Sequence, residues 1–129
     1  MTWETKRLSD RPEAMAPDGS EVRILAGCGR GSLAQFTLPP GAVSRAVRHR
    51  TVEEVWYVLS GRGRMWRAAE GREEVVELVP GLSLSIPVGT RFQFRADGDE
   101  PLTTLGTTMP PWPGEAEAIP VEGIWPPTL

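Results

Sequence analysis

The chain has 129 residues, enough for one domain, and its 40% hydrophobic and 24% charged residues are ordinary for a globular protein. A formal net charge of −3 argues against a nucleic-acid partner, and no stretch has the length and apolarity of a membrane span or a signal peptide. One histidine, His49, excludes metal sites that need two imidazoles from one chain, and the lone Cys28 excludes an intrachain disulfide, which makes the cytoplasm the expected location.

Short strands separated by glycine and proline turns are predicted along most of the chain. Residues 1–20 are polar and are expected to form an N-terminal arm. Eight strands are then expected, at residues 21–26, 32–38, 54–60, 64–68, 73–79, 82–86, 91–95 and 102–109. The glycine-rich stretch 27–31 is expected to be a loop. With no helical period, the pattern predicts an all-β fold, an antiparallel sandwich or jelly-roll barrel over residues 21–109.

The last segment, residues 110–129, has a different composition, with Trp112 and Trp125 among six prolines. Such a segment cannot form a central strand, yet its tryptophans are costly to leave in water. We expect it to lie as an extended arm on the barrel or on a partner subunit. A partly disordered tail is the alternative.

Two stretches resemble the signature motifs of the cupin superfamily. In the first, Gly41, His49, Glu54 and Gly61 occupy motif positions, and in the second, Gly81, Pro87 and Gly89 do so. The resemblance implies a double-stranded β-helix barrel with an internal pocket, often in a homodimer.

The same resemblance would imply a divalent metal bound by three histidines and a glutamate. Two of the histidine positions are Val47 and Phe92 here, so only His49 and Glu54 are retained. Two protein ligands are too few for a tight site, and we expect no cofactor. A weakly bound divalent metal at His49 and Glu54 is left open.

His49 and Glu54 are also the candidate catalytic residues. If both face the pocket, burial and mutual contact would tune their pKa values for proton transfer without a metal. The alternative is a structural remnant in which Glu54 merely satisfies His49.

Strand alternation predicts the pocket walls. The residues expected to line it are mostly apolar: Ala34, Phe36, Val47, Trp56, Phe92, Phe94, Leu105, Thr107 and Met109. A small apolar or aromatic molecule with one polar group would suit such a lining. The alternative is a filled barrel core without a cavity.

Three functions are therefore considered. The preferred one is a cupin-type barrel that binds a small, mostly apolar molecule without a tightly bound metal. The second is a metal-dependent enzyme of the dioxygenase or isomerase type with a reduced site. The third is a non-catalytic module that exists to dimerise, and whether the protein is an enzyme stays open.

Overall fold

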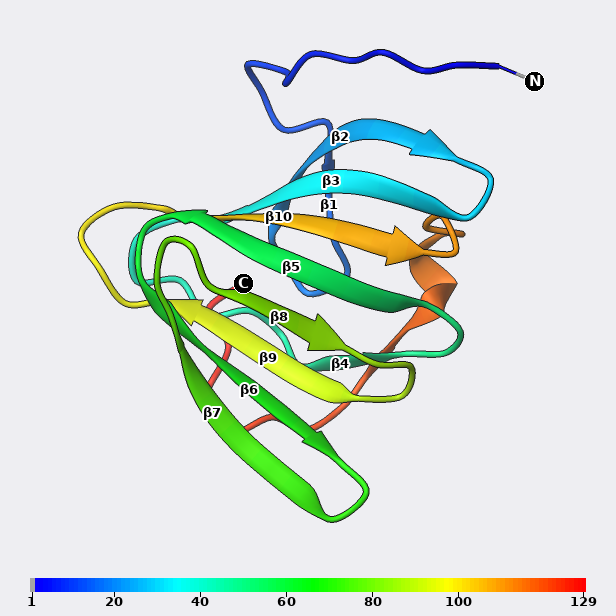
Figure 1. The fold of residues 1–129 in the computed structure, drawn as a ribbon. Coiled ribbons are helices and arrows are strands. Elements are labelled where there is room, and N and C mark those ends of the chain that lie inside the picture. Colours follow the sequence, from blue (N-terminus) through cyan, green and yellow to red (C-terminus); the bar gives the residue numbers. More distant parts are fainter. Residues whose placement is uncertain (1) are drawn as a thin grey trace.

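The computed structural model describes residues 2–129 as two antiparallel β-sheets that face each other (Figure 1). The strands are β1 (Ala14–Met15), β2 (Glu21–Cys28), β3 (Gly31–Leu38), β4 (Val47–His49), β5 (Glu53–Ser60), β6 (Gly63–Ala69), β7 (Arg72–Leu78), β8 (Ser83–Ile86), β9 (Arg91–Ala96), β10 (Leu102–Met109) and β11 (Ala118–Pro120). The first sheet has the order β1-β2-β3-β10-β5-β8 and the second β11-β4-β9-β6-β7. The predicted all-β jelly-roll fold is confirmed.

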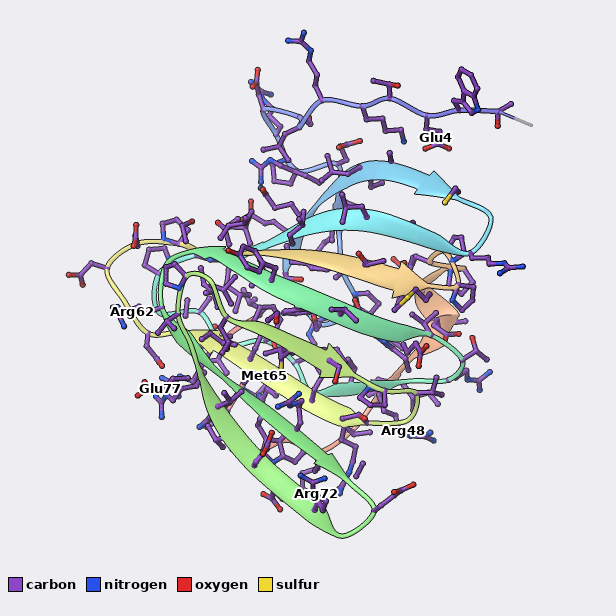
Figure 2. The ribbon with its side chains drawn as sticks, in the orientation of Figure 1. Glu4, Arg48, Arg62, Met65, Arg72 and Glu77 are labelled. Carbon is purple, nitrogen blue, oxygen red and sulfur yellow. The ribbon has the colours of Figure 1, made fainter. Side chains whose placement is uncertain are left out.

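The core lies between the two sheets, where the inward-facing side chains of both interdigitate. Alternating burial along β5 and β10 shows that each strand gives one face to this core. Met65 of β6 is fully buried there, whereas Arg62, Arg72 and Glu77 point outward (Figure 2).

The glycines shared with the cupin motifs are turn residues. Gly41, Gly61, Gly81 and Gly89 have φ angles of 78°, 84°, 92° and 81°. Side chains disfavour this left-handed region, so glycine is the residue these turns require. At Gly61 a Cβ atom would also lie 2.3 Å from the carbonyl oxygen of Pro101, which any side chain would clash with.

The carboxy-terminal segment packs on the second sheet of its own chain. β11 pairs with β4 at the edge of that sheet, and Trp125 packs against a buried cluster formed by Ala46, Trp66 and Ala68. The fully buried amide of Gln93 donates to the carbonyl oxygens of Ser44 and Trp125, both at 2.8 Å. Its oxygen accepts from the backbone N–H groups of Ile124 and Trp125, at 3.0 and 3.1 Å, which fixes the segment in place.

The amino-terminal segment runs along the edge of β2 (Figure 1). Carboxylates of Glu4 and Glu13 accept hydrogen bonds from the backbone of Gly27 and Ile24 there, at 3.2 and 3.1 Å. Edge-strand donors are thereby covered by side chains rather than by another strand. Trp3, near the start of this arm, is 87% exposed.

Three details of the predicted strand pattern are wrong. Gly27 and Cys28 belong to β2 and are not in a loop, because a register shift between Ile24 and Gly27 lets the strand continue to a tight turn. The expected arm and tail contribute the short strands β1 and β11, and β4 was not predicted at all. Strands of two or three residues are too short to show a period.

Within residues 2–129 the one helical segment is a single turn, Glu115–Glu117, and no helix there is long and apolar enough to cross a membrane.

Candidate functional site

A cavity of about 990 Å³ opens between the sheets at the β2–β3 side of the barrel and extends to the amino-terminal arm. Its walls are mainly aromatic and aliphatic, and its polar groups are few. The inner lining comprises Val22, Ile24, Ala34, Phe36, Val47, Trp56, Phe92 and Trp112, with Asp18, Ser32, His49, Glu54 and Thr108 as polar members. Trp3, Glu4 and Lys6 lie at its outer end. Small-molecule sites commonly have this composition.

Strand alternation points Glu54 and Trp56 into the barrel. In β5 these residues are buried while Glu53, Val55 and Tyr57 are exposed, as the sequence predicted. His49 ends β4, whose first residue, Val47, shares its inward face. The site is therefore built on strands from both sheets.

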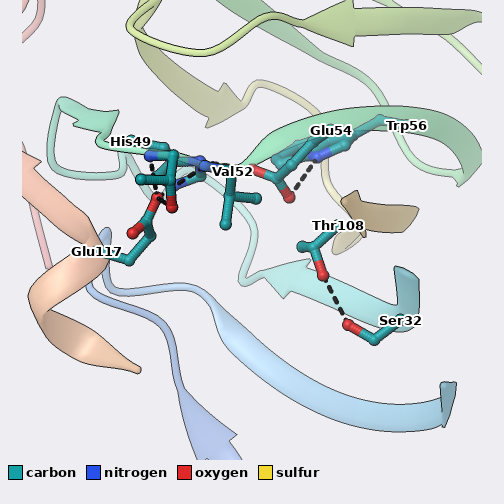
Figure 3. A network of polar contacts seen from close by, with 8 residues as sticks. Ser32, His49, Val52, Glu54, Trp56, Thr108 and Glu117 are labelled. Atoms are coloured by element: carbon teal, nitrogen blue, oxygen red, sulfur yellow. Dashed lines mark hydrogen bonds and ion pairs between the residues drawn. The ribbon is translucent and has the colours of Figure 1, made fainter. Parts of the chain in front are cut away.

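Glu54 contacts two other side chains of the cavity, those of Trp56 and His49 (Figure 3). Its Oε1 accepts a hydrogen bond of 3.2 Å from the indole N–H of Trp56, and its Oε2 lies 3.2 Å from Nδ1 of His49. The angles at the second contact are not those of a hydrogen bond, so Nδ1 has no hydrogen-bond partner among the described residues. The rings of Phe92 and Trp112 flank His49 edge-on, with centroids at 5.3 and 5.1 Å.

Burial shifts the pKa values of Glu54 and His49 in opposite directions. It raises the pKa of Glu54 to about 8, with a lowering effect from the Trp56 hydrogen bond and a further raising effect from Asp18. It lowers the pKa of His49 to about 4, against a raising effect from Glu117. At pH 7 the pair is therefore a neutral carboxylic acid beside a neutral imidazole. Such a pair can donate and accept a proton without carrying net charge.

A second buried carboxylate, Glu117, fixes the loop between β4 and β5. Its Oε1 accepts hydrogen bonds from the backbone of Thr51 and Val52 and from the Thr51 hydroxyl (Figure 3). Burial would raise the pKa of Glu117, but these bonds lower it below the usual value. The turn Glu115–Glu117 thus holds the segment that carries His49 and Glu54. Its role was not predicted, since nothing in the tail's composition indicates a contact 65 residues away in the chain.

Three further polar residues of the cavity were also missed. Asp18, only 6% exposed, accepts hydrogen bonds from the backbone and hydroxyl of Ser20 through Oδ1, at 2.9 and 2.7 Å. Ser32 and Thr108 share a hydrogen bond of 2.6 Å between their hydroxyls (Figure 3). Asp18 lies within the polar segment expected to form the N-terminal arm, and the composition of that segment does not reveal the direction of its side chain.

The predicted lining residues divide into two groups. Ala34, Phe36, Val47, Trp56 and Phe92 do line the cavity. Phe94 does not, because it is fully buried behind Trp56, with ring centroids 4.9 Å apart.

The prediction for β10 is wrong by one residue. Leu105, Thr107 and Met109 are half-buried on the other side of the strand and are not part of this cavity. The inward residues are Leu102, Thr104, Gly106 and Thr108. The strand's hydrophobic pattern misled the prediction, since its inward positions next to the cavity are threonine and glycine. A one-residue shift exchanges the two faces of a strand.

The donor set does not fit a tightly bound metal. Val47 and Phe92, at the positions of the missing histidines, are paired across β4 and β9 and present only hydrocarbon to the cavity. Residues 2–129 contain no group of three or more His, Cys, Asp or Glu side chains placed to hold a metal ion. His49 and Glu54 provide two donors, whereas tight sites use three or four.

Both the fold and the motif turns define a cupin barrel, and a family model described as "Cupin_2: Cupin domain" matches residues 34–107. The match covers more than half of the chain, which therefore belongs to the cupin family.

Among individual proteins, the uncharacterized protein MJ1618 of Methanocaldococcus jannaschii is 33% identical over 108 residues, covering 79% of this chain and 82% of that protein. Oxalate decarboxylase from Bacillus subtilis superposes with a TM-score of 0.77 at 17% identity, over 94% of this chain and 33% of that chain. The protein BH2720 of Bacillus halodurans superposes with a TM-score of 0.64 at 20% identity, over 80% of this chain and 76% of that chain.

The two structural similarities establish the fold alone. This chain spans about a third of the oxalate decarboxylase chain, and it is that enzyme which is described as having Mn(II) centres.

Proposed function

We propose that this protein binds a small, mostly apolar molecule inside the barrel and does so without a tightly bound metal. The observation that carries the proposal is the cavity, which has about 990 Å³ together with its outer end beneath the amino-terminal arm and whose inner walls include Phe36, Trp56 and Phe92. Small barrels often fill their interiors with side chains, so a cavity of this size next to buried polar groups supports ligand binding.

The substitution of hydrocarbon for metal ligands supports the same proposal. Val47 and Phe92 add apolar surface at the places where the cupin motif has imidazoles. Burying apolar ligand surface contributes about 25 cal/mol per Å², so these side chains favour an apolar ligand while removing metal affinity.

His49 and Glu54 supply the polar contact that orients the ligand. A neutral carboxylic acid and a neutral imidazole at 3.2 Å can donate to and accept from one polar group of a bound molecule. The same pair would exchange a proton with that group if the protein catalyses a reaction, which is the enzymatic form of the proposal.

Titration with 2-phenylethanol, followed by calorimetry, tests the proposal. Ala34→Leu extends a side chain into the cavity and should weaken binding about tenfold or more, which is about 1.4 kcal/mol. Ala116→Leu adds the same atoms at an exposed position outside the cavity lining and should leave binding unchanged. No binding by the native protein, or equal binding by both variants, would contradict an internal site.

We also propose that the protein is a homodimer. Val55, Tyr57 and Leu59 form a row on the outer face of β5 with exposed fractions of 47%, 47% and 42%, and apolar surface of this kind is typical of interfaces. Tyr57→Glu should lower the mass measured by sedimentation to that of one chain. Val75→Glu, at an equally exposed valine on the second sheet, should not. A single-chain mass for the native protein would rule the dimer out.

A further inference from the structure

The cavity contains two buried carboxyl groups and no buried cation. Asp18 and Glu54 are 6% and 3% exposed, and both line the cavity. Only Oδ1 of Asp18 receives hydrogen bonds from the described residues, both from Ser20, so Oδ2 remains available to a ligand. Burial raises the pKa of both groups and so favours their protonated forms in the free protein. A cationic group that binds beside a buried carboxyl can take the place of this proton.

No lysine or arginine supplies that cation in the interior. Among the residues lining the cavity the one lysine is Lys6, at the outer end near Glu4, and no arginine lines it. The charge of Arg45 acts on Asp18 and tends to lower the pKa of that carboxyl, but the guanidinium is exposed, makes no hydrogen bond to Asp18 and donates to the carbonyl oxygens of Leu129 and Pro17. The imidazole of His49 is the remaining candidate, and its burial among apolar rings disfavours a charge.

Aromatic rings surround the same space. Phe36 stacks on Trp56 with centroids 5.2 Å apart, and Phe92 and Trp112 flank His49. The face of an aromatic ring carries partial negative charge and attracts organic cations. The carboxyl groups and the aromatic faces therefore both favour a positively charged ligand.

We infer that the ligand is a small organic cation, with an ammonium group on an apolar or aromatic body. This inference rests on the proposed function. The ammonium group binds Asp18 and Glu54, and the apolar body packs against Phe36, Trp56 and Phe92. The ammonium group takes the place of the protons that burial favours on the two carboxyls in the free protein, an exchange that neither an anionic nor a neutral ligand can make.

Three ligands of nearly equal shape separate these charges: 2-phenylethylammonium, 2-phenylethanol and phenylacetate. Calorimetry on the full-length protein should give the tightest binding for the ammonium ion, about tenfold or more over the alcohol, and the weakest for the carboxylate. Equal affinity of ammonium and alcohol would overturn the inference while leaving the proposed function intact. Binding of none of the three would contradict the proposed function itself.

Asp18→Asn tests the carboxyl directly, because asparagine keeps the Oδ1 acceptor that Ser20 uses. The variant should lose most of the preference for the ammonium ion over the alcohol. Asp99→Asn removes the same charge from an exposed position and should change neither. An unchanged preference in Asp18→Asn would overturn the role of Asp18. If that variant does not fold, Glu54→Gln is measured against Glu53→Gln with the same expectation.

Discussion

Glu54 and His49 show how burial determines the charge state of the groups in a site. The carboxyl lies beside an imidazole in apolar surroundings, and burial holds both groups neutral at pH 7. In a solvated setting the carboxyl would be ionised at pH 7 and the imidazole would be partly protonated. The surrounding rings therefore determine the charge state on which binding depends.

Glu54 should make stability depend on pH. Its pKa is about 8 in the folded protein and near 4.5 when unfolded, so between these values the unfolded state binds fewer protons. Stability therefore falls as pH rises through this window, by up to about 1.4 kcal/mol per pH unit. His49 acts in the opposite direction, because its pKa is lowered in the folded state, and it adds no slope once the pH is about one unit above 6.5, its value when unfolded.

Urea unfolding of Glu54→Gln between pH 6.5 and 8 measures this contribution. The free energy of unfolding of the variant should decline less with rising pH than that of the native protein, because glutamine does not titrate. Glu53→Gln, exposed on the opposite face of β5, should decline as the native protein does. Parallel curves for native protein and Glu54→Gln would show that Glu54 is ionised in the folded state.

Gly106 fixes the shape of the cavity wall. A Cβ atom there would lie 2.6 Å from Cε2 of Phe36 and 3.1 Å from Cδ1 of Trp56. Gly106→Ala should therefore displace this aromatic pair and cost about 1–3 kcal/mol, measured by urea unfolding, with weaker ligand binding. Gly29→Ala has no atom within 4 Å of the new Cβ and serves as the control. Equal stability of the two variants would mean that the rings move freely.

At the scale of elements, the sequence predicts where the strands lie better than it predicts which side chains of each strand point into the barrel. The inward set of β5 could be predicted because the spacing between the motif residues Glu54 and Gly61 fixes the register, although aromatic and branched residues lie on both faces of the strand. In β10 threonine and glycine occupy the inward positions beside the cavity, so hydrophobicity indicates the wrong face. Sites that leave room for a ligand weaken the pattern from which burial is predicted.

Gln93 holds the carboxy-terminal segment on the second sheet, and its removal should release that segment. Gln93→Leu removes the hydrogen-bond partner of four backbone groups, those of Ser44, Ile124 and Trp125, so we expect a loss of about 2–4 kcal/mol in urea unfolding and faster proteolysis within residues 110–129. Gln35→Leu, at a half-buried position of β3, is the control. Unchanged proteolysis would show that Trp125 and β11 suffice to hold the segment.

At the scale of the whole molecule, the family motifs predict the barrel but not the contacts that complete its site. The turn glycines and prolines specify the connections, and the fold follows from them. Asp18 and Glu117 come from the arm and the tail, outside the matched residues 34–107. Contacts between distant segments have no local sequence signal, which is why both acids were missed.

The central claim is that ligand binding in this barrel is independent of metal. Calorimetric titration of 2-phenylethanol into chelator-treated protein, repeated after equilibration with Mn²⁺ or Zn²⁺, tests it most directly. The structure predicts the same affinity in every case, because the cavity walls and the Glu54–His49 pair contain no metal ligand set. Binding that appears only after metal is added would contradict the account.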